Sequence, residues 1–186
     1  MNYYISDTHF GHKNVIKLDC RPFNDINEMD NALITNWNSI VNDDDDVWIL
    51  GDLCFRSGKD SSYYLRKLNG KKHLIIGNHD KEVLINKKAC DCLDTIEKMY
   101  HIKDGNHDIV LCHFPIADWN GRHKGSYHIY GHIHNMKNEV SDFMNKLGNA
   151  YNAGCMINNY IPVTLNELIV NNKTYESLIK DKLDIE

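Results

Sequence analysis

The sequence lacks three features that would each point to a particular class of protein. It has no excess of basic charge, because 21 Lys and Arg residues face 26 Asp and Glu residues and the formal net charge is −5. Domains that bind long nucleic acid usually carry a basic face, so this balance argues against that class but leaves a short nucleotide substrate open. No run approaches the roughly 20 apolar residues of a membrane span, and the opening NYYISD carries no charged or long apolar leader. We therefore expect a cytoplasmic protein without a membrane partner.

The six cysteines lack the C-x-x-C spacing of a zinc ribbon or a redox site. The closest pair is Cys90 and Cys92, and no second pair lies near it to complete a four-cysteine zinc site. We expect reduced cysteines, as is typical of cytosolic proteins. Internal repeats, linkers and low-complexity segments are also missing, and 186 residues with 42% hydrophobic content suit one folded unit. The sequence predicts a single domain over residues 1–186, and it leaves the oligomeric state open.

The apolar pattern of the first half alternates between short strands and helices. Apolar runs of strand length stand at 3–6, 47–50 and 73–76, and helical spacing at 12–18, 26–41 and 61–68 lies between them. Such alternation is typical of βαβ units and a largely parallel sheet. After about residue 95 the pattern predicts a hairpin around DGNH, strands within 126–132, 148–154 and 160–170, and a closing helix over 173–186. The fold class is therefore α/β (α+β), with mixed sheets and helices outside.

Five of the predicted strands end in residues that bind metals or move protons. In chain order these residues are Asp7 and His9, then Asp52, then Asn78, His79 and Asp80, then His113, and finally His132 and His134. In open α/β sheets, sites form in the crevice beyond the carboxyl ends of the strands. Residues two apart in an extended segment share a face, so each D-x-H or H-x-H pair can point at one spot. Carboxylates, imidazoles and an amide form an O/N donor set that suits Mn, Fe, Zn or Ni.

Charge accounting indicates an anionic ligand for such a site. Two divalent ions held by Asp7, Asp52, neutral histidines and Asn78 would leave a residual charge of about +2, which attracts phosphate. The same charge lowers the pKa of a bound water toward roughly 7. Asn78 is useful here because its amide offers an oxygen without cancelling positive charge.

The motifs D-x-H, G-D, G-N-H-D, H and G-H-x-H, in this order, resemble those of the calcineurin-like metallophosphoesterase superfamily. The opening SDTHFGH and the small size resemble its compact prokaryotic or phage-type branch, which has no cap domain. The resemblance implies a four-layer α/β/β/α fold in which two packed mixed sheets are flanked by helices. It also implies a binuclear centre of two divalent transition-metal ions, with Mn²⁺ favoured and Fe, Zn or Ni as alternatives.

The resemblance implies a role for each motif residue. Asp7, His9, Asp52 and His134 would hold the first ion, and Asp52 would bridge to a second ion that Asn78, His113 and His132 complete. His79 would act as the general acid, and Asp80 would orient it. The implied reaction is in-line attack of a metal-bridging hydroxide on phosphorus.

The loop at 117–126 lies between the ligands His113 and His132, so we expect it beside the metals. It offers Trp119 for stacking on a ring, and Asn120 and His123 for polar contacts with the substrate. Three residues outside the loop, Arg21, Arg56 and His12, could contact the phosphate. Each of these six residues could instead be an ordinary packed or exposed residue. The four aspartates at 43–46 precede a strand, away from the expected site, and predict a solvated turn.

We therefore predict a metal-dependent phosphoesterase that hydrolyses a small phosphodiester such as a nucleotide. A phosphomonoesterase acting on a nucleotide, a sugar phosphate or a phosphoprotein would use the same core. A nuclease fits less well because the chain lacks a basic stripe. A non-catalytic scaffold fits less well because every residue of the ligand set is present.

Overall fold

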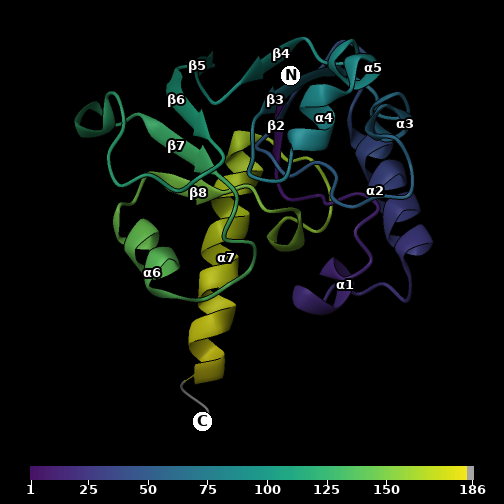
Figure 1. The fold of residues 1–186 in the computed structure, drawn as a ribbon. Helices are drawn as coiled ribbons and strands as arrows, with labels where there is room; N and C mark the ends of the chain where they lie inside the picture. Colours follow the sequence, from purple (N-terminus) through teal and green to yellow (C-terminus); the bar gives the residue numbers. More distant parts are fainter. Residues whose placement is uncertain (184–186) are drawn as a thin grey trace.

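Two four-stranded sheets form the centre of the computed structural model, which describes residues 1–183 (Figure 1). The strand order is β1-β2-β3-β4 in the first sheet and β5-β6-β7-β8 in the second. Neighbouring strands of the first sheet are all parallel, whereas the second sheet combines parallel pairs with the antiparallel pair β5–β6. The strands are β1 (Asn2–Ile5), β2 (Asp46–Ile49), β3 (Lys71–Ile75), β4 (Thr95–Glu97), β5 (Met99–Asp104), β6 (His107–Cys112), β7 (Tyr127–Tyr130) and β8 (Ala150–Asn152).

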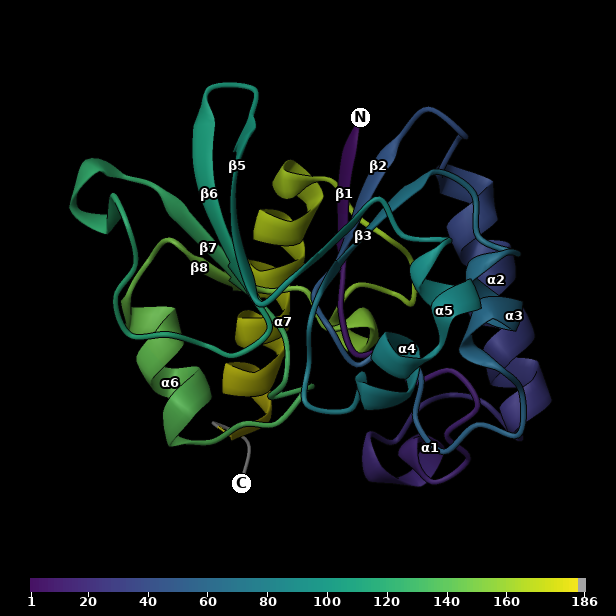
Figure 2. The ribbon, with the colours of Figure 1, turned by 45° about the horizontal axis from the view of Figure 1, so that its top comes forward.

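Helices cover the outer faces of both sheets, which confirms the expected four layers. Helices α2, α3, α4 and α5 lie on the side of the first sheet, and α6 lies on the side of the second (Figure 2). Helix α7 packs against β1 and β8, where the two sheets meet. The helices are α1 (Val15–Leu18), α2 (Ile26–Ile40), α3 (Ser61–Leu65), α4 (Lys81–Ile85), α5 (Lys87–Cys90), α6 (Glu139–Lys146) and α7 (Leu165–Leu183).

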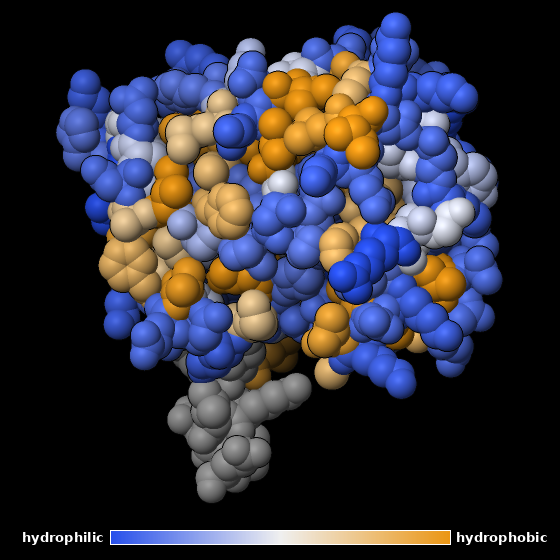
Figure 3. Space-filling view, viewed as in Figure 1, coloured by the Kyte–Doolittle hydropathy of each residue, from blue (hydrophilic) through white to orange (hydrophobic). Residues whose placement is uncertain are grey.

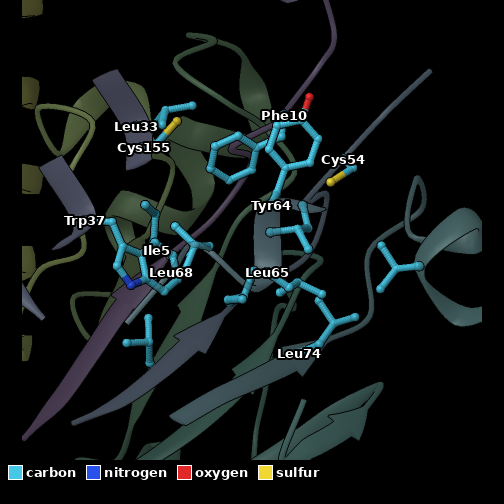
Figure 4. Packing of buried hydrophobic residues seen from close by; sticks show 14 of the residues in the cluster. Ile5, Phe10, Leu33, Trp37, Cys54, Tyr64, Leu65, Leu68, Leu74 and Cys155 are labelled. Atoms are coloured by element: carbon cyan, nitrogen blue, oxygen red, sulfur yellow. The ribbon is translucent and has the colours of Figure 1, made fainter. Parts of the chain in front are cut away.

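The strands of the first sheet are buried on both faces because their side chains alternate between two cores. On β1, Ile5 packs with Leu33 and Trp37 of α2 in the core between helices and sheet (Figure 4). Its neighbour Tyr4 points the other way and packs with Leu111 of the second sheet. Burial on both faces explains why these strands read as continuous apolar runs.

The strand expected within 160–170 is wrong for most of its length, because α7 begins at Leu165. Only Val163 pairs with a strand, in an isolated antiparallel bridge to Tyr4. The helix start has a sequence signal in Thr164-x-x-Glu167, where the Thr164 amide and hydroxyl donate to Glu167 Oε2 at 2.8 and 2.7 Å. The helix expected over 173–186 forms the later part of α7, and residues 184–186 lie outside the described residues.

The surface of the view in Figure 3 is largely hydrophilic, with hydrophobic surface gathered over α4, whose Leu84 and Ile85 are exposed. Within residues 1–183, no helix combines the length and the apolar character that a membrane crossing requires. The aspartates at 43–46 lie at the start of β2, and Asp45 accepts a hydrogen bond of 2.8 Å from the terminal amine of Met1. These carboxylates are therefore at the opposite end of the strand from the polar residues that follow it.

Candidate metal centre

The seven predicted metal ligands meet beyond the carboxyl ends of five strands. Asp7 and His9 follow β1, Asp52 follows β2, Asn78 follows β3, His113 follows β6, and His132 and His134 follow β7. The two sheets bring these ends together, so segments up to 125 residues apart in the chain are in contact. The ligands divide into two groups that share Asp52.

The first half-site consists of Asp7, His9, Asp52 and His134. One ligand atom from each of these side chains lies within 4.8 Å of the others. The Nε2 atoms of His9 and His134 are 3.2 Å apart, and His9 Nε2 lies 3.7 Å from Asp52 Oδ2. Asp7, His9 and Asp52 are at most 2% exposed. A buried set with two carboxylates and two imidazoles suits a divalent cation, because buried charges need a compensating partner.

The second half-site consists of Asp52, Asn78, His113 and His132. Asn78 Oδ1 lies 3.0 Å from His113 Nε2 and 2.9 Å from His132 Nδ1. His113 Nε2 lies 3.7 Å from Asp52 Oδ2, the same distance that separates this oxygen from His9 Nε2. Asp52 Oδ2 is therefore placed between the two half-sites, where a bridging ligand would be.

The tautomers of two histidines show that the site fits cations. His113 Nδ1 lies 2.6 Å from the Leu50 carbonyl, and His134 Nδ1 lies 2.8 Å from Asp19 Oδ1. Because these partners accept hydrogen bonds, Nδ1 carries the proton and Nε2 carries a lone pair in both neutral rings. The Nε2 lone pair of His113 then faces the oxygens of Asn78 and Asp52, and that of His134 faces Asp7 Oδ1 at 3.7 Å. Lone pairs that converge without protons between them suit a divalent cation.

Five of the seven ligands have backbone angles that L-residues rarely adopt. The φ angles are 56° for Asp7, 50° for His9, 54° for Asp52, 71° for His132 and 53° for His134. Such residues each cost roughly 1–3 kcal/mol and persist only where the surroundings enforce them. Their concentration in one site indicates that the fold is strained here in order to aim these side chains inward.

Two glycines allow the strand ends to approach closely. A Cβ atom on Gly51 would collide with the ring of His113, and one on Gly77 would collide with the carboxylate of Asp52. Gly51 also has a φ of 83°. Any side chain at either position would push apart the ligands of the second half-site.

The structure places Asp80 differently from the sequence prediction. Its buried carboxylate accepts hydrogen bonds from the backbone amides of Asp52 (3.0 Å), Leu53 (2.9 Å) and Gly77 (2.7 Å). Among the described residues it makes no hydrogen bond to the ring of His79. The prediction that Asp80 orients His79 is therefore corrected: Asp80 ties the turn after β2 to the turn after β3.

Arg21 also differs from its prediction as a phosphate contact, because its guanidinium is completely buried. It donates to Asp19 Oδ2 at 2.8 Å and to the carbonyls of Asp7 (2.8 Å) and Thr8 (2.9 Å). Asp19 in turn accepts from His134 Nδ1. Burial tends to raise the pKa of Asp19, but the His134 hydrogen bond and the Arg21 charge outweigh burial and lower it. Arg21 therefore supports the candidate metal site from beneath.

Sequence reasoning missed Asp19, which is buried and holds the ring of His134. A metal-ligating histidine usually donates its other ring N–H to a carboxylate or a carbonyl. The residue follows α1 and lies 115 positions from His134 in the chain. No motif in the local sequence marks Asp19 as a partner of His134.

His79, His12 and Arg56 gather around Phe55 on the open side of the first half-site. The Phe55 ring lies 4.1 Å from the ring of His79, 4.8 Å from that of His12, and 5.1 Å from the Arg56 guanidinium carbon. The His79 side chain is 36% exposed, its Nε2 lies 4.0 Å from Asp52 Oδ2, and its amide donates to Asp52 Oδ1 at 2.8 Å. Arg56 is exposed, and the buried Nδ1 atom of His12 has no partner among the described residues. These three side chains can face an anion above the metal centre.

The loop at 117–126 does not present Trp119 as expected. The indole is 7% exposed, packs with Val110, Tyr130 and Met144, and donates to the Ser126 carbonyl at 3.1 Å. The prediction that Trp119 stacks on a substrate ring is therefore corrected, because its faces are covered. Asn120 and His123 are exposed on this loop, so their predicted contacts with substrate stay predictions.

Comparisons with known proteins identify relatives that cover most of the chain, although no family model matches it. The uncharacterized protein MJ1445 of Methanocaldococcus jannaschii is 36% identical over 170 residues, which are 90% of this chain and 88% of that protein. The gene 66 protein of Mycobacterium phage L5 is 31% identical over 159 residues, covering 71% of this chain and 76% of that protein. The crystal structure of the protein of unknown function AQ665 from Aquifex aeolicus has a TM-score of 0.71 and 28% identity, with 90% of this chain and 96% of that one covered. The chain therefore belongs to one family with MJ1445, and it shares its two-sheet fold with AQ665.

Proposed function

We propose that this protein is a phosphoesterase that holds two divalent ions and hydrolyses a small phosphodiester such as a nucleotide. The observation that carries the proposal is the convergence of two sets of lone-pair donors on Asp52 Oδ2, at 3.7 Å from a histidine of each half-site. The alternative of a site for one ion would leave Asn78 Oδ1 facing the lone pair of His113 without a cation between them.

The ligand roles follow from the two half-sites. Asp7, His9, Asp52 and His134 would hold one ion, and Asn78, His113, His132 and the shared Asp52 would hold the other. Divalent ions in such sites polarise phosphoryl oxygens and lower the pKa of water into the neutral range. The O/N donor set favours Mn²⁺, with Fe, Zn and Ni as alternatives.

The charge balance supports an anionic substrate. Asp7 and Asp52 offset two of the four positive charges of two ions, so about two remain, while the Asp19 carboxylate is paired with Arg21. His12 and Arg56 add donors on the open side of the site. A phosphate placed there would meet the ions on one side and these side chains on the other.

His79 is the residue proposed to protonate the leaving oxygen. Its ring is partly exposed, is held against Phe55, and points its Nε2 toward the shared carboxylate at 4.0 Å. A positioned imidazole in this place can reach an oxygen of a bound phosphate, which is the geometric condition for general acid catalysis. Asn78 is also exposed, so a phosphate with two substituents can approach the second half-site.

Metal analysis combined with two chromogenic substrates tests the proposal. We expect about two equivalents of transition metal per chain after reconstitution, and faster hydrolysis of bis-p-nitrophenyl phosphate than of p-nitrophenyl phosphate in the presence of Mn²⁺. Parallel assays with Ni²⁺, Zn²⁺ and Mg²⁺ identify the preferred ion. A preference for p-nitrophenyl phosphate would establish a phosphomonoesterase instead, and a protein that binds no transition metal and hydrolyses neither ester would be a non-catalytic relative.

A further inference from the structure

Residues of α6 and α7, which both lie on the side of the second sheet (Figures 1 and 2), line a pocket. The proposed metal ligand His134 forms part of its wall. Its volume is about 70 Å³. Since one buried water needs roughly 10–15 Å³, the pocket has room for about five waters. Because His134 belongs both to this wall and to the first half-site, a group bound here would lie close to that half-site.

A tyrosine that lines the pocket has a hydroxyl free to bond a ligand. Tyr130, at the end of β7, is 2% exposed and lines the pocket, and its hydroxyl makes no hydrogen bond within the described part of the chain. Burial, together with the nearby carboxylate of Glu176, raises the pKa of Tyr130, so the hydroxyl stays protonated. Because Tyr130 lines the pocket, a polar atom of a bound ligand can form a hydrogen bond with its hydroxyl.

The walls and the rim of the pocket have different chemistry. Ile133, Met136 and Tyr175 supply apolar surface on which a flat ring can lie. At the rim, the Asn145 amide nitrogen lies 3.0 Å from Glu176 Oε1 once the amide is oriented to donate, which leaves the Asn145 oxygen free to accept. The pocket thus combines flat apolar faces with an edge of hydrogen-bond acceptors and one hydroxyl.

The charges around the pocket disfavour a second phosphate. Asp142 and Glu176 face a single cation, Lys137, so the local balance is −1. This contrasts with the positive charge proposed for the metal centre. A ligand that spans both places would put its phosphate on the metals and a neutral ring with N–H groups in the pocket.

We propose that this pocket binds the base of a nucleotide substrate whose phosphate lies on the metal centre. The inference rests on the proposed phosphoesterase function, and it assigns Tyr130 and Asn145 to recognition of the base. A nucleobase has the required shape and chemistry, since it is flat and apolar on its faces and carries N–H donors and acceptors on its edge.

Nucleoside binding tests the pocket separately from catalysis. Adenosine, guanosine, cytidine and uridine carry no phosphate, so calorimetric titration of the purified protein with each reports on the base alone. We expect at least one nucleoside to bind, with affinity about fivefold weaker in Tyr130→Phe, the effect of one hydrogen bond. Asn145→Phe, on the exposed surface of α6, fills the mouth of the pocket and should weaken binding at least tenfold. Tyr127→Phe, at the other end of β7, is the matched control and should bind as the wild type does.

Competition with bis-p-nitrophenyl phosphate then separates a substrate subsite from an independent effector site. We expect the bound nucleoside to raise KM for this ester without lowering kcat. Hydrolysis of the ester by a protein that binds no nucleoside would overturn the pocket and leave the phosphoesterase intact. Binding without competition would overturn the subsite, and nucleoside binding by a protein that hydrolyses no ester would overturn the proposed function.

Discussion

The two halves of the proposed metal centre share one carboxylate but differ in burial and charge. In the first half-site, three of four ligands are at most 2% exposed, and Asp7 contributes a second carboxylate beside Asp52. In the second, Asn78 is exposed, His132 is half-buried, and Asp52 is the single negative charge. An ion in the first half-site would therefore be attracted more strongly and would exchange less readily with solvent.

This difference shows how the proposed site would both hold metal and accept substrate. The buried half-site is fixed further by Asp19 and Arg21, which hold His134 from beneath. The open half-site and the cluster around Phe55 leave room on the other side for a phosphate. We infer that the first half-site anchors the centre and that the second is where substrate and ion are exposed to solvent.

Removal of the shared carboxylate should have the largest effect, because Asp52 belongs to both halves. Mutation of a group that only supports a metal ligand typically lowers metal affinity or activity by about 10–100-fold. Because Asp52 would itself be a ligand of both ions, we expect Asp52→Ala to lower metal affinity and turnover by roughly 10³-fold or more. Plasma mass spectrometry and hydrolysis of bis-p-nitrophenyl phosphate measure the two quantities. Asp46→Asn, at the start of the same strand, is the control and should retain both ions. Full metal content in Asp52→Ala would disprove the shared site.

His79→Ala should separate catalysis from metal binding. Because its ring lies outside both ligand sets, we expect a metal content close to that of the wild type and a kcat roughly 10²-fold lower, the usual scale for a general acid. His101→Ala, an exposed histidine on β5, should change neither quantity. Loss of metal in His79→Ala would show that the side chain is a ligand and would redraw the boundary of the first half-site.

The strand-end residues could be predicted because two local rules place them. Apolar runs of four or five residues mark buried strands, and the carboxyl ends of parallel strands meet at one edge, so Asp7, Asp52 and Asn78 had to lie near one another. The positive φ angles of ligands such as His9 could not be predicted, since they result from contacts with other segments. The T-x-x-E signal at Thr164 was available in the sequence and marks the start of α7, where the Thr164 amide donates to Glu167 Oε2.

The supporting residues could not be predicted, because their partners are remote in the chain. Asp19 meets His134 only once the turn after α1 packs beneath the sheet ends. Asp80 looks like a partner for its neighbour His79, yet it bonds to amides 27 and 28 residues away. The burial of Trp119 likewise depends on Met144 in α6, which packs against the same core. Local sequence specifies donor types, whereas tertiary packing decides what each donor reaches.

Asp19→Asn should weaken the first half-site alone. The amide can still accept from His134, but it no longer compensates the charge of Arg21 or strengthens the imidazole as a ligand, so we expect a roughly 10–100-fold loss of affinity for the more tightly bound ion. Calorimetric titration with Mn²⁺ should show the weaker step nearly unchanged. Arg21→Gln is the companion variant, because it removes the guanidinium but keeps the Asp19 carboxylate that holds His134. Equal losses of affinity and of Tm in both variants would indicate a purely structural role for the pair.

Asn78→Asp should have the smallest effect of these variants. It should strengthen metal binding but weaken turnover. A second carboxylate in the open half-site strengthens attraction for its ion, so titration should show the weaker Mn²⁺ step tightened toward the stronger one. The same charge lowers the residual positive charge of the loaded centre from about +2 to +1, which weakens the hold on a phosphate. We expect kcat/KM for bis-p-nitrophenyl phosphate to fall roughly tenfold although the metal is bound more tightly.

Asn120→Asp, a charge change on the exposed loop that follows β6, tests whether the effect needs direct contact with the ion, since it should leave the Mn²⁺ affinities unchanged. If Asn78→Asp raised both metal affinity and turnover, neutrality at this position would have no bearing on phosphate binding, and the contrast between the two half-sites would be one of burial alone.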